Sequence, residues 1–308
     1  MSPKMSETKE SAEMEVLSAR GASYWQIVFR RLKKHKLAIF SAILLTIIII
    51  LCVGAPLFTK YKLDYYEGDD PNNPYLGVYK PPSKYHWFGT DELGRDEFTR
   101  ILYGGRVSLL VGFASVISSI LIGIFVGAWA GYYGGLIDTL LMRFTDIMFS
   151  IPILPLLVVL AAIIPGGGVW KIVLVITIFG WMTVARLVRG MYLSLKENEY
   201  TEAARAIGAS NVRIMFRHLL PNAMAPVIVS ATLGVGGNII FESALSFLGF
   251  GIMPPTPSWG NMLQNAQNSM FLAPWLVWFP GLAIFITVLS FNFLGDGLRD
   301  ALDPRLKI

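Results

Sequence analysis

Long apolar runs without a single charged side chain constrain the fold of this sequence more than any other feature. The clearest run, residues 37–57, has 21 residues and contains no Asp, Glu, Lys or Arg. A helix of that length is long enough to cross ~30 Å of hydrocarbon. Only 15% of the chain is charged, whereas about 25% is usual for soluble domains. The sequence therefore predicts an all-α integral membrane protein.

Six transmembrane helices are expected. They cover residues 37–57, 107–131, 146–164, 169–188, 223–250 and 276–295. Pro152 and Pro155 interrupt the third run, which predicts a kink that packs against protein rather than lipid. Residues 251–275 carry no charge but contain four prolines. This composition predicts a loop that is held against the membrane or folds partly back into it.

Lysine and arginine are distributed unevenly between the segments that connect these spans. An even number of spans places both termini on one side, together with residues 132–145 and 186–222. That side holds 18 of the 26 Lys and Arg residues. The positive-inside rule therefore makes both termini cytoplasmic and residues 58–106 an extracytoplasmic loop.

Residues 1–36 are expected to form a cytoplasmic amino-terminal tail. Their last part, residues 23–36, combines aromatic side chains with a basic cluster. This combination is typical of a basic interfacial helix on an anionic membrane surface. The alternative is that these residues are flanking charges of the first span, and both interpretations place them on the cytoplasmic side.

A polar, charge-dense stretch, residues 199–221, separates the fourth and fifth apolar runs. The Glu-Ala-Ala triplet at 202–204 favours a short helix, and Gly208 can adopt the left-handed conformation that ends one. Ser210 is a potential N-cap of a second short helix, which Pro221 closes or kinks. A helix–glycine–helix unit is also typical of DNA-binding proteins. Its position between membrane spans argues against a nucleic-acid partner.

The same stretch resembles the EAA loop of ABC-importer permeases, which docks the cytoplasmic ATPase subunits in that family. The matching positions, and hence the predicted ATPase-docking residues, are Glu202, Ala203, Ala204, Gly208, Leu220 and Pro221. One position departs from the pattern, because His218 stands where isoleucine is usual.

A second stretch, Phe88 to Asp96, reads Phe-Gly-Thr-Asp-Glu-Leu-Gly-Arg-Asp. It resembles the FGTDxxGRD signature of the oligopeptide, dipeptide and nickel branch of these permeases. The alternative is a surface loop with an acidic turn.

The resemblance extends over nearly the whole chain and implies a C-type permease subunit with the type I ABC-importer permease fold. Residues 107–308 would then be the core permease domain, with five transmembrane helices and an EAA-type loop at 199–221. The implied location is the cytoplasmic (inner) membrane of a bacterium or archaeon. The implied partners are a second homologous permease, two cytoplasmic ABC ATPases and an extracytoplasmic substrate-binding protein.

The chain itself is expected to be a non-catalytic subunit. It contains no GxxxxGK[ST] phosphate loop, so ATP and magnesium would be bound by the partner ATPases. No cofactor or metal site is expected in the chain. The resemblance implies peptides as substrates, with oligosaccharides or nickel complexes as alternatives within the same family.

Glu242 is the only carboxylate well inside a predicted span. An ionisable side chain in lipid is costly and by default a functional candidate. Asn238 lies four residues earlier on the same helical face, so both are candidate pore-lining residues. The alternative for Glu242 is a structural pair with Asn238 or with a polar group on a neighbouring span.

A secondary transporter, which needs no ATPase, is the competing functional class. It would require more intramembrane ionisable groups and an inverted repeat, and neither is visible in the sequence.

Overall fold

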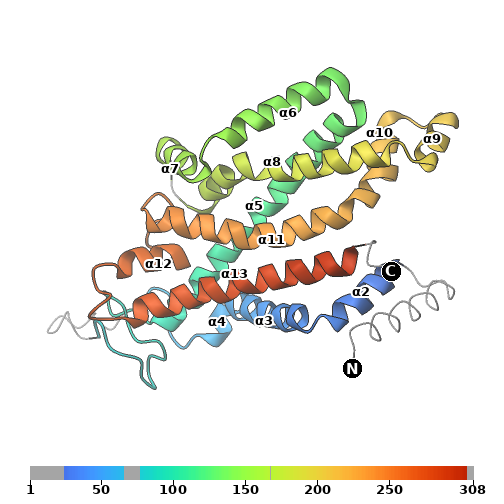
Figure 1. The fold of residues 1–308 in the computed structure, drawn as a ribbon. Coiled ribbons are helices and arrows are strands. Elements are labelled where there is room, and N and C mark those ends of the chain that lie inside the picture. Colours follow the sequence, from blue (N-terminus) through green and yellow to red (C-terminus); the bar gives the residue numbers. More distant parts are fainter. Residues whose placement is uncertain (1–23, 66–76, 167, 304–308) are drawn as a thin grey trace.

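The computed structural model describes residues 24–65, 77–166 and 168–303, and this part of the chain folds into a helical bundle. The long helices run between the two ends of the bundle, as Figure 1 shows. They are α3 (Lys36–Val53), α5 (Glu97–Tyr133), α8 (Val169–Leu195), α11 (Leu220–Phe247) and α13 (Trp275–Leu302). The expectation for residues 1–23 lies outside the described residues.

The number of membrane spans agrees with the prediction of six. Within the described residues, five helical segments are long and apolar enough to cross a membrane. A bent pair, α6 (Gly135–Ser150) and α7 (Ile153–Ile163), makes a sixth span if the two helices are counted together.

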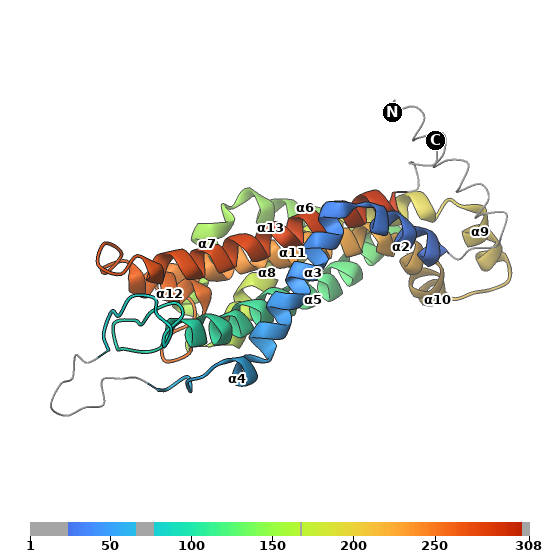
Figure 2. The ribbon, with the colours of Figure 1, turned by 90° about the horizontal axis from the view of Figure 1, so that it is seen from below.

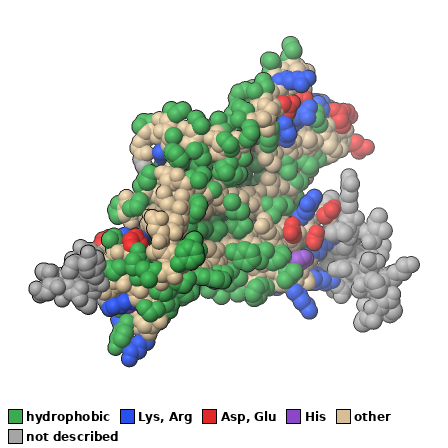
Figure 3. Space-filling model, turned by 60° about the vertical axis from the view of Figure 1, so that its left-hand side comes forward, with side chains coloured by type: hydrophobic (Ala, Val, Ile, Leu, Met, Phe, Trp, Pro, Cys, Tyr) green, Lys and Arg blue, Asp and Glu red, His purple; other side chains and the backbone are tan. Residues whose placement is uncertain are grey.

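The outer surface of the bundle is apolar between its two ends. Figure 3 shows hydrophobic side chains over the middle of the molecule, with charged side chains gathered toward the ends. Phe40, Ile117, Leu140 and Phe285 are all more than half exposed in the isolated chain. Apolar surface of this extent is what lipid or a membrane partner covers.

Helices α5 and α8 form the closest packed pair in the bundle. Gly123, Gly127 and Gly131 recur every fourth residue along α5, and α8 lies directly against them. A Cβ atom on Gly131 would lie 2.6 Å from the Cβ of Tyr192, so only glycine fits there. Small residues at such a contact allow helices in a membrane to approach closely.

Helix α5 begins at Glu97, inside the stretch that was predicted to be an extracytoplasmic loop up to residue 106. Asp96 caps it by accepting a hydrogen bond from the Thr99 amide at 2.8 Å. The Glu97 and Arg100 side chains are buried although both are ionisable. The prediction placed the helix start too late because it treated charged residues as the limit of the span.

The apolar loop at 251–275 contains a short helix, α12 (Trp259–Ala266), that packs against this first part of α5. The indole Nε1 of Trp259 donates to the Ile101 carbonyl oxygen at 3.0 Å. Ser258 caps α12 through a capping box with Asn261. This stretch therefore folds against the bundle, and its expected position against or partly within the membrane stays a prediction.

The third predicted span is broken rather than kinked. Helices α6 and α7 meet at 90°, and the break falls at Ile151, which is extended before Pro152 as a residue preceding proline prefers to be. Pro152 and Pro155 are exposed in the chain. The prediction that these prolines pack against protein is therefore wrong for the isolated chain, in which Pro152 borders an open cavity.

The basic stretch before the first span forms helix α2 (Tyr24–Lys34). Its buried Val28 packs with Val229 on α11 and Ala301 on α13. His35 then caps α3 by accepting from the Ala38 amide at 3.1 Å. In Figure 2, seen from below, α2 lies over the end of α13, and α3 runs obliquely across the bundle away from it.

Candidate functional site

The EAA-like stretch projects from one end of the bundle, here called the loop end, and α12 lies at the opposite end, the far end (Figure 1). It begins with helix α9 (Glu199–Ala206). Gly208 has φ +79° and ends that helix, as predicted. Ser210 then caps the next helix by accepting from the Arg213 amide at 3.4 Å, also as predicted.

The predicted docking residues of the first helix divide between two faces. Glu202, Ala203 and Gly208 are exposed, whereas Ala204 is buried against the bundle. Three large apolar side chains that the sequence analysis did not single out are exposed beside them: Tyr200, Ile207 and Val212. Ile207 is 86% exposed. The outer face of this stretch is therefore partly apolar, with an acidic residue within it.

The second helix continues into α11 instead of ending at Pro221. It passes through α10 (Asn211–Arg213) and a π-helical turn, η1 (Ile214–Leu219). Proline lacks an N–H and its ring crowds the carbonyl four residues earlier, which here belongs to Arg217. The wider π register accommodates this, because the Leu220 amide bonds to the Met215 carbonyl five residues back. Leu220 is half-buried and Pro221 is exposed.

Two tyrosines fasten this segment to the α5–α8 pair. The Tyr132 hydroxyl on α5 donates to Asn211 Oδ1 at 2.8 Å. The Tyr192 hydroxyl on α8 donates to the Met215 carbonyl oxygen, also at 2.8 Å. Ile214 and Leu219 are buried in the same contact. The 211–219 segment is thus connected directly to α5 and α8.

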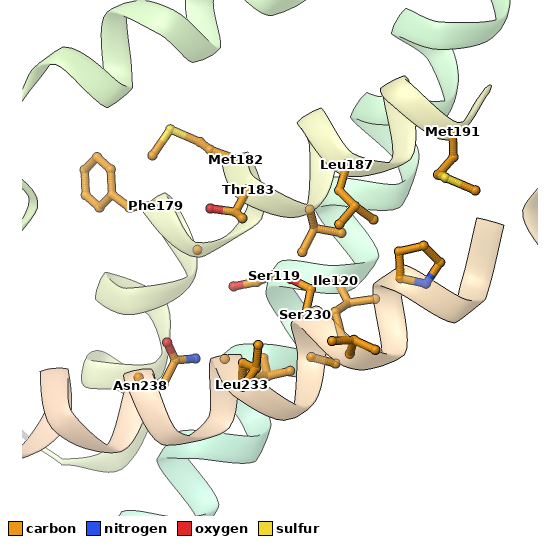
Figure 4. A pocket seen from close by; sticks show the side chains of 18 of the residues that line it. Ser119, Ile120, Phe179, Met182, Thr183, Leu187, Met191, Ser230, Leu233 and Asn238 are labelled. Carbon is orange, nitrogen blue, oxygen red and sulfur yellow. The ribbon is translucent and has the colours of Figure 1, made fainter. Parts of the chain in front are cut away.

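A cavity of about 1420 Å³ is lined mainly by α5, α8 and α11, with the end of α6, the start of α7 and the end of α13 at its borders. It extends from Pro221 and Leu302 at the loop end to Phe241 near the far end. Figure 4 shows neutral polar side chains on its walls, among them Ser119, Thr183, Ser230 and Asn238. The charged residues among the described lining are Arg299 and Asp303, both in the last turn of α13 or just beyond it. Four methionines also line it: Met148, Met182, Met191 and Met224.

The structure separates the two candidate pore-lining residues. Asn238 lines the cavity (Figure 4). Glu242 does not, although it lies one turn further along the same helical face, because its side chain is fully buried between α11 and α5. Its carboxylate accepts from Ser108 Oγ on α5 and from Ser246 Oγ, both at 2.8 Å. Its observed partners are therefore serines, and Asn238 is not among them.

The Phe88–Asp96 loop is folded tightly against the start of α5. Asp91 accepts from the Leu93 and Arg95 amides, both at 2.9 Å, and its carboxylate lies 2.6 Å from Arg95 Nε. Asp96 caps α5 and also lies 2.9 Å from His86 Nδ1. The acidic residues of the signature thus hold the loop together at the far end.

Comparison with known families supports what the geometry indicates. Residues 123–308 match the family described as binding-protein-dependent transport system inner membrane component. Residues 23–82 match the N-terminal transmembrane domain of oligopeptide transport permease C.

Characterised relatives match the chain over nearly its full length. The dipeptide transport system permease protein DppC of Alkalihalophilus pseudofirmus is 46% identical, over 92% of this chain and 91% of the relative. The oligopeptide transport system permease protein OppC of Bacillus subtilis is 39% identical, over 96% and 95%. The glutathione transport system permease protein GsiD of Escherichia coli is 43% identical, over 92% and 91%.

A solved structure of the MetNI methionine ABC transporter shares the fold. The TM-score is 0.53 at 21% identity, and the match covers 66% of this chain and 96% of that chain. Together, the matched family, the long relatives and the helical bundle show that the chain belongs to the binding-protein-dependent transport system inner membrane components, as a C-type permease of the oligopeptide and dipeptide branch.

Proposed function

We propose that this permease forms half of the translocation path of a peptide importer and that its 199–213 loop docks a cytoplasmic ATPase. The observation that carries the proposal is the exposed face with Tyr200, Glu202, Ile207 and Val212 at the loop end. An exposed apolar group with a charge beside it is typical of a protein interface. The tyrosine bonds behind it give any docked protein a rigid connection to α5 and α8.

In this proposal the loop end and both termini are cytoplasmic, and the far end is extracytoplasmic. The excess of Lys and Arg in the segments predicted to be cytoplasmic supports that orientation. A second homologous permease completes the path, two ATPases hydrolyse ATP with magnesium, and a substrate-binding protein delivers the substrate at the far end. The chain itself contributes no catalytic group and binds no cofactor or metal.

Peptides are the substrate class that the cavity and the relatives favour. Hydroxyl and amide groups of Ser119, Thr183, Ser230 and Asn238 can bond to peptide N–H and C=O groups. Methionines are flexible and accommodate side chains of different shape. The DppC and OppC relatives are dipeptide and oligopeptide permeases by name. Oligosaccharides and nickel complexes, which other members of this family import, remain the alternative substrates.

Charge reversal at the loop tests the docking proposal. Glu202→Lys places a cation in the apolar face without touching any transmembrane helix, so we expect normal membrane insertion and at least a tenfold loss of uptake. Co-purification of the tagged permease with its ATPases measures docking directly. Glu197→Lys is the matched control, because Glu197 is also exposed but lies before α9. Full uptake and normal co-purification by Glu202→Lys would refute the proposal.

The substrate is tested with the complete transporter in proteoliposomes. We expect ATP-dependent uptake of labelled di- and oligopeptides, and no uptake of an oligosaccharide or a nickel complex. Uptake of either of those instead of peptides would overturn the substrate assignment and leave the docking proposal intact.

A further inference from the structure

The buried carboxylate of Glu242 has no role in the translocation path proposed above. It lies on α11, one residue beyond Phe241, which lines the end of the cavity. Its side chain is fully buried. The carboxylate is surrounded by serine hydroxyls: Ser108 on α5, Ser246 one turn further along α11, and the neighbouring Ser243 at 3.5 Å. Ser258, the N-cap of α12, is a further hydroxyl partner.

Two of these serines also accept hydrogen bonds from the segment that leads into α12. Ser246 Oγ accepts from the Ile252 amide at 3.1 Å. Ser108 Oγ accepts from the Trp259 amide, the first N–H of α12, at 3.2 Å. The carboxylate therefore sits at the centre of a network that joins α5, α11 and both ends of the 252–259 segment.

The directions of the hydrogen bonds in this network require a side chain at position 242 that only accepts hydrogen bonds. A serine hydroxyl has one hydrogen and two lone pairs. When Ser108 and Ser246 both donate to Glu242, their lone pairs face the Trp259 and Ile252 amides. A glutamine at 242 would donate from its NH₂ group to one of the two serines. The hydroxyl of that serine would then have to donate its hydrogen bond to a different acceptor within a buried site.

Glycines at both ends of the same segment allow its backbone to lie directly against α11. A Cβ atom on Gly260 would lie 2.5 Å from the Ser243 Cα, and one on Gly251 would collide with Ser246 Oγ. No residue of the described 251–275 stretch lines the cavity. The segment and α12 thus lie behind the end wall of the cavity, on its far side.

We propose that Glu242 is a positioning residue that holds α12 and the 252–259 segment in place as the closure of the cavity at the far end. It fixes α12 to α5 and α11, so that the three move as one body when the path opens against the partner permease. The proposal rests on the proposed function for one point, that the far end faces the extracytoplasmic side.

Thiol labelling across the membrane tests this role. The parent is the complete nucleotide-free transporter in proteoliposomes, with Cys52→Ala and a single reporter, Asn238→Cys, in the cavity. A membrane-impermeant maleimide is added from the extracytoplasmic side. We expect slow labelling in the parent and at least tenfold faster labelling with Glu242→Gln, because a loosened α12 opens the end wall. Ser108→Ala removes one arm of the network and should give a smaller acceleration.

Ser115→Ala is the matched control. Ser115 is also a buried serine on α5, seven residues beyond Ser108, and its hydroxyl has no hydrogen-bond partner among the described residues. Its removal should leave the labelling rate at that of the parent.

Three results would overturn the proposal. One is fast labelling already in the parent, and another is a labelling rate for Glu242→Gln equal to that of Ser115→Ala. The third concerns the case in which Glu242→Gln does not assemble. A labelling rate for Ser108→Ala equal to that of Ser115→Ala would then overturn the proposal. Labelling needs no substrate, so a failure to import peptides would refute the proposed function without deciding this test.

Discussion

The two ends of α11 are held in different ways. At the far end, a fully buried carboxylate and three serines bond α11 to α5 and to the segment before α12. At the loop end, α11 is continuous with a π-helical turn, and the Tyr192 phenol fastens that turn to α8. The helix is thus anchored at one end and connected to an exposed loop at the other. This difference suits a helix that receives motion at the loop end and keeps its packing at the far end.

The largest expected effect comes from breaking the α5–α8 pair, on which both ends depend. A side chain at Gly127 would collide with the Ala185 backbone, which cannot move aside as a side chain would. Gly127→Val should therefore destabilise the protein by about 3 kcal/mol or more, as overpacking does. Thermal unfolding of the purified permease in detergent measures this loss.

Gly190→Ala is the control for that experiment. It lies on α8, and nothing stands within 4 Å of the Cβ that alanine would add. Alanine in a helix should leave stability unchanged or raise it by up to about 1 kcal/mol. Equal stability of Gly127→Val and Gly190→Ala would contradict the described contact between the two helices.

An intermediate effect is expected at the tie between η1 and α8. Tyr192→Phe removes only the hydroxyl that donates to the Met215 carbonyl, which should cost about 1 kcal/mol of stability. The larger consequence should be functional: a several-fold drop in peptide transported per ATP hydrolysed, with ATPase co-purification unchanged.

Tyr133→Phe is the matched control for the tyrosine tie, because Tyr133 is an exposed tyrosine at the end of α5, the other helix of the pair. Its transport per ATP should equal that of the wild type. A normal ratio for Tyr192→Phe would show that the loop transmits motion by another contact.

The smallest effect is expected at the cap of the second loop helix. The bond from the Arg213 amide to Ser210 Oγ is long, 3.4 Å, and exposed. Ser210→Ala should cost about 0.5 kcal/mol, at the low end for N-caps, and Ser210→Asp should restore it. A loss above about 2 kcal/mol in thermal unfolding would mean that the cap, rather than the tyrosines, holds the loop.

Local patterns predicted much of the loop end. The Gly208 turn and the Ser210 cap follow from the conformational preferences of single residues, and both are observed. The π-helical turn was missed, because its only local signal is Pro221. The exposure of Ile207 was also missed, since an apolar residue in a short amphipathic helix is normally expected to face inward.

The structure of the far end could not be predicted, because it depends on contacts between residues that are distant in the sequence. Ser108 is 134 residues from Glu242 in the chain, so a buried carboxylate could be identified but its partners could not. In the same way Glu97 and Arg100 were assigned to the extracytoplasmic loop at 58–106, because α12, which covers the start of α5, could not be placed from sequence. The spans themselves were predictable, since lipid imposes a long charge-free run on each of them.

The central claim is that α11 is anchored at the far end and moved at the loop end. Hydrogen–deuterium exchange of the complete transporter, with and without ATP under conditions that block hydrolysis, tests it most directly. We predict that ATP changes the protection of amides in residues 199–219, while the Ile252 and Trp259 amides stay protected in both states. Equal changes at the two ends, or rapid exchange of Ile252 and Trp259 without ATP, would contradict the account.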